Sequence, residues 1–295
     1  MKIQVTSNAI QEIGQRSNQE DSLYPSIEAS PSRGDLYILC DGMGGHAAGE
    51  VASKAVCAAM SEYLMSHRRE EDRFEQVDFS AALKHAYDAL DENDTEDEKK
   101  MGTTLVLARF HSGGCFVAHI GDSRIYHIRP ASKQILYVSK DHSLVNDLIS
   151  LGELTPEQAK TSPQKNIITR ALQPHQDYPA KADIENLTDL KPGDYIYMCS
   201  DGMLERMDDQ ELISILSLPE SDTKKMDLLR DRTKDNRDNH SAHLIRITSI
   251  ESMESDDSVK AESRNGRWLR IIAIMFFILL LCTFIGFVLK THYFV

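Results

Sequence analysis

The chain has 295 residues and a formal net charge of −13 at pH 7, which disfavours nucleic acid as its main partner. Phosphate backbones are bound through clustered lysine and arginine, whereas this composition has an acidic excess. The five cysteines are scattered and form no C-x-x-C pair, so neither a disulfide framework nor a zinc site is expected.

The first hundred residues predict two strands and two helices around a glycine-rich turn. An apolar run over 36–40 predicts a strand that ends at the carboxylate of Asp41. Gly42, Gly44 and Gly45 form a turn after it, and apolar residues at helical spacing predict a helix from this turn to about residue 67. The other elements predicted here are a strand over 3–7, a helix over 78–90 and a solvated acidic loop over 91–100.

Strand signals follow one another closely between residues 105 and 138. Turn residues such as Gly113-Gly114 and Gly121-Asp122 separate them, which predicts hairpins in an antiparallel sheet. Thr155-Pro156-Glu157-Gln158 has the capping-box pattern of a helix start. The predicted elements are strands over 105–110, 115–120, 124–129, 134–138, 195–200 and 242–248, and helices over 142–151, 155–160, 209–216 and 223–233.

The C-terminal end predicts a membrane anchor. Residues 271–289 form an uncharged, mostly apolar run that is long enough to cross a bilayer as a helix. Arg264, Arg267 and Arg270 precede the run, so the positive-inside rule places the N-terminal part in the cytoplasm. The alternative is a buried core helix, which would normally show a polar face. We expect a globular domain over 1–249, a polar linker over 250–266, a single transmembrane helix over 267–290 and a short tail over 291–295.

Two of the predicted strands end in the same way, with Asp41-Gly42-Met43 and with Asp201-Gly202-Met203. If these strands are neighbours, their carboxylates converge, and bound cations relieve the repulsion between them. Further acidic residues complete a set of oxygen ligands: Glu20, Asp21, Asp122 and Asp238. Such ligands select Mg²⁺ or Mn²⁺, and two ions about 4 Å apart can present a hydroxide for attack on phosphorus. Arg16 can then hold the phosphate oxygens through its planar fork of donors.

The order of the motifs along the chain resembles the type 2C metal-dependent protein phosphatases in their bacterial form. The match extends over residues 1 to about 249 and includes six motifs in family order. These are Arg16 with Glu20-Asp21, Asp41-Gly42-Met43-Gly44-Gly45-His46, Met101-Gly102-Thr103-Thr104, Gly121-Asp122-Ser123-Arg124, Ser200-Asp201-Gly202 and Asp238-Asn239. Asp141-His142-Ser143-Leu144 and the segment through 169–172 look like the mobile flap of those enzymes.

This resemblance implies a fold, a reaction and a role for each site residue. The fold is α+β, a four-layer α-β-β-α sandwich of two mainly antiparallel sheets. The reaction is hydrolysis of phosphoserine or phosphothreonine in proteins, and the partner enzyme is a serine/threonine protein kinase. Arg16 binds the substrate phosphate, and Asp41 bridges two metal ions. The implied ligands are Asp201 and Asp238 for one ion, Glu20 and the carbonyl of Gly42 for the other with Asp21 beside it, and Asp122 with Asp201 for a third, weaker ion.

Two positions depart from the family pattern, and two other functions stay open. Met43 stands where animal members carry a histidine thought to act as general acid, and His240-Ser241 replaces an apolar residue and threonine. The turn over 42–47 also matches the G-x-G-x-x-A pattern of a dinucleotide site, although Asp41 would repel a pyrophosphate. A catalytically inactive, membrane-tethered module that binds phosphoproteins is the second alternative, although a scaffold has no need for mutually repelling acids.

Overall fold

The computed structural model describes residues 2–30, 32–44, 47–68, 73–94, 101–251 and Met275. One compact unit spans Met1–Glu251 and holds all the strands of the described chain. The predicted linker beyond Glu251, the predicted membrane helix and the tail lie outside the described residues, apart from Met275. Within the described residues, no helix has the length and apolar character needed to cross a bilayer.

Eleven strands and six α-helices follow one another in the described part of the chain. The strands are β1 (Lys2–Glu12), β2 (Asp21–Tyr24), β3 (Leu36–Met43), β4 (Gly102–Thr103), β5 (Leu105–His111), β6 (Gly114–Ile120), β7 (Arg124–Arg129), β8 (Gln134–Val138), β9 (Asp183–Leu187), β10 (Tyr195–Cys199) and β11 (His240–Glu251). The helices are α1 (Ala47–Ser66), α2 (Gln76–Glu92), α3 (Leu144–Ser150), α4 (Pro156–Thr161), α5 (Asp209–Leu216) and α6 (Asp222–Thr233), with a short 3-10 helix η3 (Asp201–Leu204) after β10.

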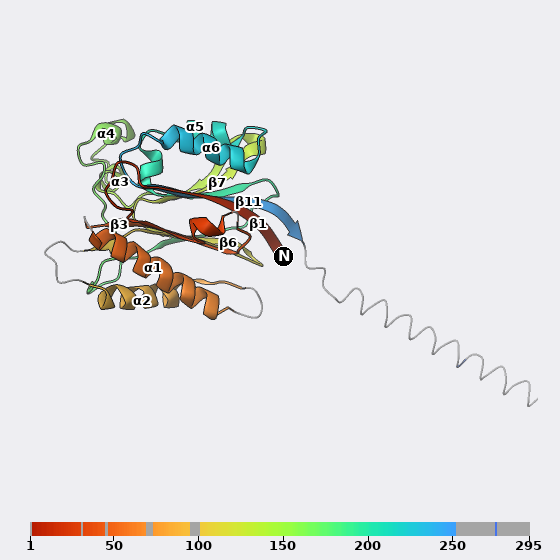
Figure 1. Cartoon of the computed structure of the whole chain (residues 1–295), viewed down its shortest axis with the longest axis horizontal. Helices are drawn as coiled ribbons and strands as arrows, with labels where there is room; N and C mark the ends of the chain where they lie inside the picture. The colour runs from red at the N-terminus through yellow and green to blue at the C-terminus, as the bar shows by residue number, and fades with distance from the viewer. Residues whose placement is uncertain are drawn as a thin grey trace, which may run out of the picture. The chain divides into compact units, whose positions relative to one another are not determined.

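Two antiparallel sheets stack face to face in this unit (Figure 1). The first sheet has the order β1-β11-β10-β7-β8, and the second has the order β2-β3-β5-β6-β9 with β4 paired to β3. Alternate residues of each strand point into the space between the sheets. Ile245 and Ile247 of β11 therefore share one core with Met198 of β10 and with Tyr37 and Leu39 of β3.

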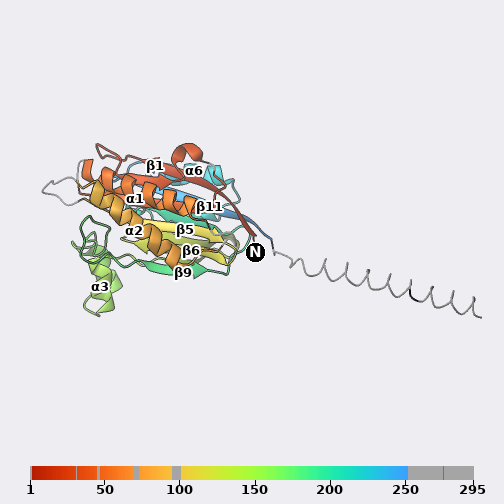
Figure 2. The same ribbon diagram turned by 90° about the horizontal axis from the view of Figure 1, so that it is seen from below.

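Helices cover both outer faces of the sandwich, with α5 and α6 on one side and α1 and α2 on the other (Figure 1), and Figure 2 shows α1 and α2 lying across the second sheet. Val56 and Met60 lie one turn apart on α1, and they share a core with Phe79 of α2 and with the outer face of the second sheet. Leu212 of α5 and Leu229 of α6 belong to the core on the outer face of the first sheet. The described architecture therefore has the four layers, α-β-β-α, that the resemblance implied.

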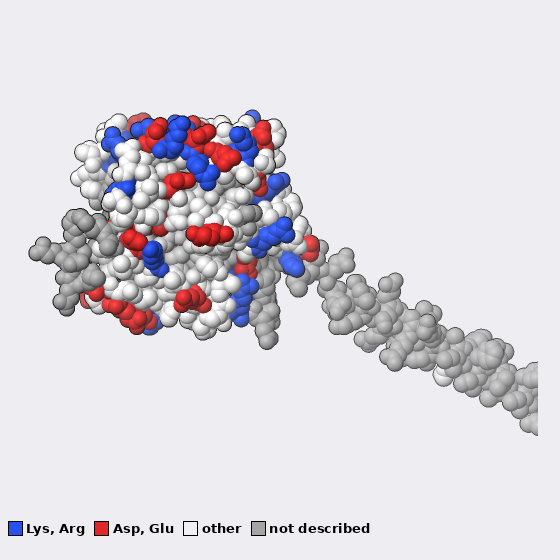
Figure 3. All heavy atoms as spheres, viewed as in Figure 1, with Lys and Arg blue, Asp and Glu red and all other residues white. Residues whose placement is uncertain are grey.

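Charged side chains of both signs cover the face formed by α5 and α6 (Figure 3). On this face Arg230 Nε lies 3.0 Å from Glu12 Oε1, and Arg232 pairs with Glu211. Exposed ion pairs of this kind contribute little to stability. They show that acidic groups are interspersed with basic ones here, so the acidic excess of the chain is not concentrated on this face.

The predicted strands and helices occur with shifts at their ends, but three short strands and one connection differ. The sequence patterns missed β2, β4 and β9, which are held by pairing with longer strands. The predicted hairpin at Gly121-Asp122 is wrong, because this turn carries the chain from β6 in the second sheet to β7 in the first. Gly121 has φ +107°, which favours glycine, and a Cβ there would lie 2.6 Å from Thr104 Cγ2. β3 and β10 likewise belong to different sheets and are not neighbours within one.

Candidate metal centre

Asp41 lies near the end of β3, where its backbone is fixed from two sides. Its N–H donates to Thr104 Oγ1 at 3.0 Å, and its carbonyl oxygen accepts from the N–H of Thr104 at 2.8 Å. On the other side, β2 places Asp21 directly opposite Asp41 in antiparallel register. Facing residues of paired strands lie close together, so carboxylates from two separate segments meet at this strand end.

Gly42 lets two further segments approach the same strand end. Its N–H donates to the carbonyl oxygen of Glu20 at 3.0 Å. A Cβ at position 42 would lie 2.1 Å from the carbonyl oxygen of Gly49 in α1, a separation that no side chain permits. A Cβ at position 49 would in turn lie 3.0 Å from Cδ of Glu20. The two glycines therefore bring the Glu20 side chain and the start of α1 against the end of β3.

The first sheet supplies its carboxylates from the end of β10 and from the loop before β11. Asp201 opens η3 directly after β10. A Cβ on Gly202 would lie 2.0 Å from the carbonyl oxygen of Asn239, so glycine allows these two segments to touch. Asn236 Nδ2 donates to the carbonyl oxygen of Gly202 at 2.7 Å, and the N–H of Asn239 donates to Asp238 Oδ1 at 2.8 Å. These bonds hold Asp238 where its charge acts on Asp201.

Hydrogen bonds join the sheets at this end of the sandwich. Ser200 Oγ, at the end of β10, donates to Asp21 Oδ2 at 3.0 Å, and both residues are buried. Asn239 Oδ1 accepts from the N–H of Glu20 at 2.8 Å. The contacts gather acidic side chains from both sheets, far apart in the chain, into one cluster.

Burial and, after it, repulsion within the cluster raise the pKa of its carboxyl groups. Burial raises the pKa of Asp41 well above its usual range, and the charges of Asp21 and Asp201 raise it further. Burial raises the pKa of Asp122 to about 7, and the charge of Asp201 adds to this effect. Burial and then the charge of Asp238 raise the pKa of Asp201 to about 6. Each of these carboxyl groups therefore lies close enough to another for its charge to raise the pKa of that neighbour or to be raised by it.

The cluster fits a divalent cation. Oδ1 of Asp21 and Oδ1 of Asp122 are buried and have no hydrogen-bond partner. A buried carboxylate oxygen without a partner is costly, and oxygen donors of this kind suit Mg²⁺ or Mn²⁺. The described residues therefore provide oxygen donors for such an ion. The ion would in turn be the partner that Oδ1 of Asp21 and Oδ1 of Asp122 lack.

Arg16 lies at the edge of the cluster. Its Nη2 donates to Asp238 Oδ2 at 2.7 Å, while 52% of its side chain stays exposed. The hydrogen bond and charge of Asp238 raise the pKa of Arg16, so the side chain is positively charged. A guanidinium has five N–H donors, so the pair with Asp238 leaves others available to a ligand.

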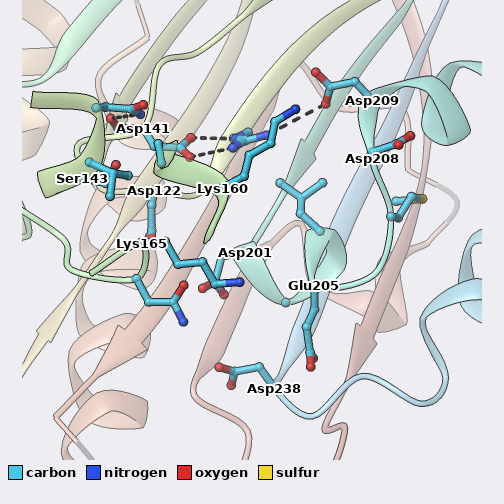
Figure 4. Close-up of a pocket in the computed structure, with 18 of the residues that line it drawn as sticks. Asp122, Asp141, Ser143, Lys160, Lys165, Asp201, Glu205, Asp208, Asp209 and Asp238 are labelled. Atoms are coloured by element: carbon cyan, nitrogen blue, oxygen red, sulfur yellow. Dashed lines mark hydrogen bonds and ion pairs between the residues drawn. The ribbon is translucent and has the colours of Figure 1, made fainter. Parts of the chain in front are cut away.

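A cleft of about 1040 Å³ opens beside the cluster (Figure 4). Arg16, Asp122, Asp201 and Asp238 all line it. The predicted flap contributes Ser143, Val145, Ile149, Ala159, Lys160 and Lys165, and the segment from η3 to α5 contributes Leu204, Glu205, Met207, Asp208 and Asp209. A ligand in this cleft would therefore contact the flap, the acidic cluster and the start of α5 at the same time.

Sequence reasoning missed several residues that hold the site together. Thr104 belongs to the motif over 101–104, but its contacts with Asp41 and with Ser123 Oγ, at 2.8 Å, arise only in the fold. Arg124 Nε and Nη2 each lie 2.7 Å from a carboxylate oxygen of Asp141, which ties β7 to the segment leading into the flap. Both residues lie in motifs that the sequence marks, whereas the pairing between them arises only in the fold.

A two-sheet sandwich that brings carboxylates from both sheets to one end defines the class of the metal-dependent phosphatases. It differs from a dinucleotide fold, because β3 pairs antiparallel with β2, β4 and β5 and the glycine turn lacks the parallel strand of a βαβ unit. The family model of protein phosphatase 2C matches residues 12–244, and the chain belongs to this family.

Bacterial phosphatases are among the relatives of the chain. It is 34% identical over 205 residues to the serine/threonine protein phosphatase PstP of Mycobacterium tuberculosis, a match that covers 70% of the chain and 37% of PstP. It is 32% identical over 208 residues to protein phosphatase PhpP of Streptococcus pneumoniae, which covers 70% of the chain and 82% of PhpP. The chain thus spans little more than a third of PstP but most of PhpP.

Solved structures of bacterial serine/threonine phosphatases share the fold. The enzyme of S. agalactiae superposes with a TM-score of 0.71 at 28% identity, over 82% of this chain and 99% of that chain. The catalytic domain of PstP in complex with 2 manganese ions superposes with a TM-score of 0.66 at 28% identity, over 84% of this chain and 100% of that chain.

Proposed function

We propose that the chain hydrolyses phosphoserine and phosphothreonine in proteins at a centre of two Mn²⁺ or Mg²⁺ ions, with a third ion beside them. The observation that carries this proposal is the cluster around Asp41 and Asp201 beside the cleft, with buried oxygens of Asp21 and Asp122 left without partners. The names of the relatives PstP and PhpP support the reaction. The two manganese ions bound by PstP support the metal.

The residue roles follow the family pattern on the positions that match it. In this proposal Asp41 bridges two ions, Asp201 and Asp238 complete one of them, and Glu20, the Gly42 carbonyl and Asp21 serve the other. Asp122 and Asp201 hold the third. When bound, the ions would neutralise the carboxylates, polarise the phosphate and acidify an attacking water. The chain itself orients these groups through Thr104 and the close glycine contacts, and Arg16 binds the phosphate oxygens through its remaining donors.

The test is hydrolysis of a phosphothreonine peptide by the full chain in detergent, with Mn²⁺, with Mg²⁺ and with a chelator. We expect turnover only with a metal, and nearly complete loss of turnover in Asp41→Asn. The matched control is Asp88→Asn, because Asp88 is exposed on α2, away from the cluster, and pairs with Lys84 at 2.9 Å. Turnover in Asp41→Asn would contradict the ligand assignment. Peptide binding without turnover in the unmodified chain would support the inactive binding module.

We also propose that a helix over 267–290 tethers this domain to the cytoplasmic face of a membrane. The proposal rests on the uncharged run over 271–289 and on the arginines before it. The natural counterpart of the enzyme is a serine/threonine protein kinase that acts on the same proteins. Cells expressing the full chain should retain it in the membrane fraction after a high-salt wash, and a chain ending at residue 251 should be released. Equal distribution of the two chains would reject the tether.

A further inference from the structure

His142 connects the flap to the turn that carries Asp122. It is buried, with 5% of its surface exposed, and lies directly before the flap helix α3. Its backbone N–H donates to the carbonyl oxygen of Gly121 at 2.9 Å, and its carbonyl oxygen accepts from the N–H of Thr169 at 2.9 Å. Its ring Nδ1 accepts from the N–H of Gly121 at 3.1 Å. His142 therefore contacts both polar backbone groups of the residue that precedes Asp122.

The other ring nitrogen of His142 is fixed by the start of β9. Nε2 lies 3.3 Å from Asp183 Oδ2, and Arg170 Nη1 lies 3.0 Å from Asp183 Oδ1. Because Nδ1 accepts a hydrogen bond, a neutral ring carries its proton on Nε2 and donates it to Asp183. Nδ1 already accepts from Gly121, so Nε2 carries the proton toward Asp183, and Arg170 Nη1 bonds to Asp183 rather than to the ring.

These side chains do not themselves form a metal site, although ligand atoms of His119, His142 and Asp183 lie within 4.8 Å of one another. An ion bound by an imidazole nitrogen lies near the plane of that ring. The rings of His119 and His142 are stacked, with centroids 4.6 Å apart and planes inclined by 12°, so the two planes do not meet near the nitrogens. The guanidinium of Arg170 also lies 3.1 Å from His142 Nε2, where a shared ion would have to bind.

The turn at Asp122 is held from its other side by Thr104. Thr104 Cγ2 lies against Gly121, and Thr104 Oγ1 contacts Ser123 Oγ at 2.8 Å. Oδ1 of Asp122 itself has no hydrogen-bond partner. The position of this carboxylate oxygen therefore depends on the backbone of the turn, and His142 and Thr104 are the side chains that hold that backbone.

We propose that His142 is a positioning residue that holds Asp122 in place for the third cation. This inference rests on the proposed function, because that function assigns Asp122 to a cation. Outer partners that orient a ligand typically change metal affinity by about 10- to 100-fold when they are removed. His142 is such a partner through the peptide N–H of Gly121, and it also links the cation to the base of the flap.

The chain offers a matched control in His111, the last residue of β5, at the hairpin that leads into β6. His111 Nδ1 accepts from the N–H of Gly113 at 3.1 Å, its Nε2 lies 3.0 Å from Asn186 Oδ1, and the residue is also buried. It thus makes the same kind of bridge to a glycine N–H, at a turn without a predicted ligand. Replacing either histidine by leucine removes a hydrogen bond from a glycine N–H to a ring nitrogen. Only the hydrogen bond of His142 holds the turn that carries Asp122.

The experiment measures Mn²⁺ binding to the full chain in detergent by calorimetry, together with kcat, KM and the unfolding midpoint without metal. We expect His142→Leu to weaken the weakest Mn²⁺ step by about 10-fold or more, and His111→Leu to leave all steps unchanged. His142→Asn should recover most of the affinity, because its Oδ1 can accept from Gly121 as Nδ1 does. The loss should appear in kcat and in the Mn²⁺ requirement rather than in KM.

Three results would overturn this role for His142. They are an unchanged weakest Mn²⁺ step in His142→Leu, an equal loss in His111→Leu, and the absence of a third Mn²⁺ step in the unmodified chain. Binding is measured without substrate, so the inference and the proposed function can fail separately. A chain that binds three Mn²⁺ ions and shows the expected His142 effect, yet hydrolyses no phosphopeptide, would reject the phosphatase proposal and leave the positioning role intact.

Discussion

Manganese binding to this chain should depend steeply on pH, because the cluster holds protons that a cation must displace. Burial is the first cause of each shift, raising the pKa of Asp21 to about 7, of Asp122 to about 7 and of Asp201 to about 6. In the metal-free protein these groups are protonated below pH 6. A carboxyl group with a raised pKa favours the folded state at low pH, and that contribution is lost as pH rises through the raised pKa.

The size of the effect follows from the number of protons released. Between pH 5 and 6, Asp21 and Asp122 each give up a proton when a cation binds, and Asp201, with a pKa of about 6, gives up most of another, so the affinity should rise by at least about 100-fold. Two protons correspond to about 2.7 kcal/mol, at 1.36 kcal/mol for each proton and each pH unit. At saturating Mn²⁺ the shift in thermal midpoint on adding metal should grow by roughly 5–10 °C over the same pH unit.

Calorimetry in two buffers that differ in ionisation enthalpy counts these protons directly. We expect at least two protons released near pH 5.5 and fewer near pH 8, where Asp21, Asp122 and Asp201 are already ionised. Asp21→Asn keeps an oxygen that can accept from Ser200, and it should release about one proton fewer. An affinity that stays constant from pH 5 to pH 8 would refute the claim that these carboxylates are mutually repelling ligands.

Three further predictions concern single side chains. Burial lowers the pKa of His243 to about 4, so as pH falls from 6.5 the unfolded chain binds a proton before the folded chain does. The free energy of unfolding should therefore drop by about 3 kcal/mol between pH 6.5 and pH 4, and His243→Phe should remove that part of the pH dependence in urea unfolding. Gly202→Ala places a Cβ 2.0 Å from the carbonyl oxygen of Asn239; it should cost about 1–3 kcal/mol in unfolding free energy and most of the activity, whereas Gly34→Ala, with no such contact, should cost little. Arg16→Ala should raise KM about 10- to 100-fold with a smaller change in kcat, and unchanged kinetics would reject its role in phosphate binding.

The helices and the longer strands could be predicted because they depend on local periodicity, whereas the four layers were implied by the family resemblance. The helix predicted over 209–216 has these bounds in the structure, where Leu212, Ile213 and Leu216 are buried on one face. β9 was missed because its sequence, Asp183-Ile184-Glu185-Asn186-Leu187, is mostly polar and exposed. Its strand conformation comes from pairing with β6, which is a contact that local sequence does not encode.

The acidic members of the site could also be named in advance, but not the way in which they meet. The matching ends at Asp41 and Asp201 predict that the two carboxylates converge if their strands are neighbours. They come instead from facing sheets, and the contact between Ser200 and Asp21 crosses between those sheets. A pattern in the sequence marks each strand end, whereas the distance between two ends depends on the packing of the whole sandwich.

Close backbone contacts hold the acidic cluster together, whereas its charged side chains repel one another. The carbonyl of Gly49 lies against Gly42, and that of Asn239 lies against Gly202, at separations that exclude any Cβ. The glycines and the acids therefore have opposite effects on the metal-free fold. Gly202→Ala should lower its stability, whereas Asp21→Asn should raise it at pH 8 by removing a buried charge, although both changes weaken Mn²⁺ binding. If both substitutions lowered metal-free stability equally, the buried and mutually repelling charges would not destabilise the metal-free fold, and the role of the cluster as a cation site would lose its physical basis.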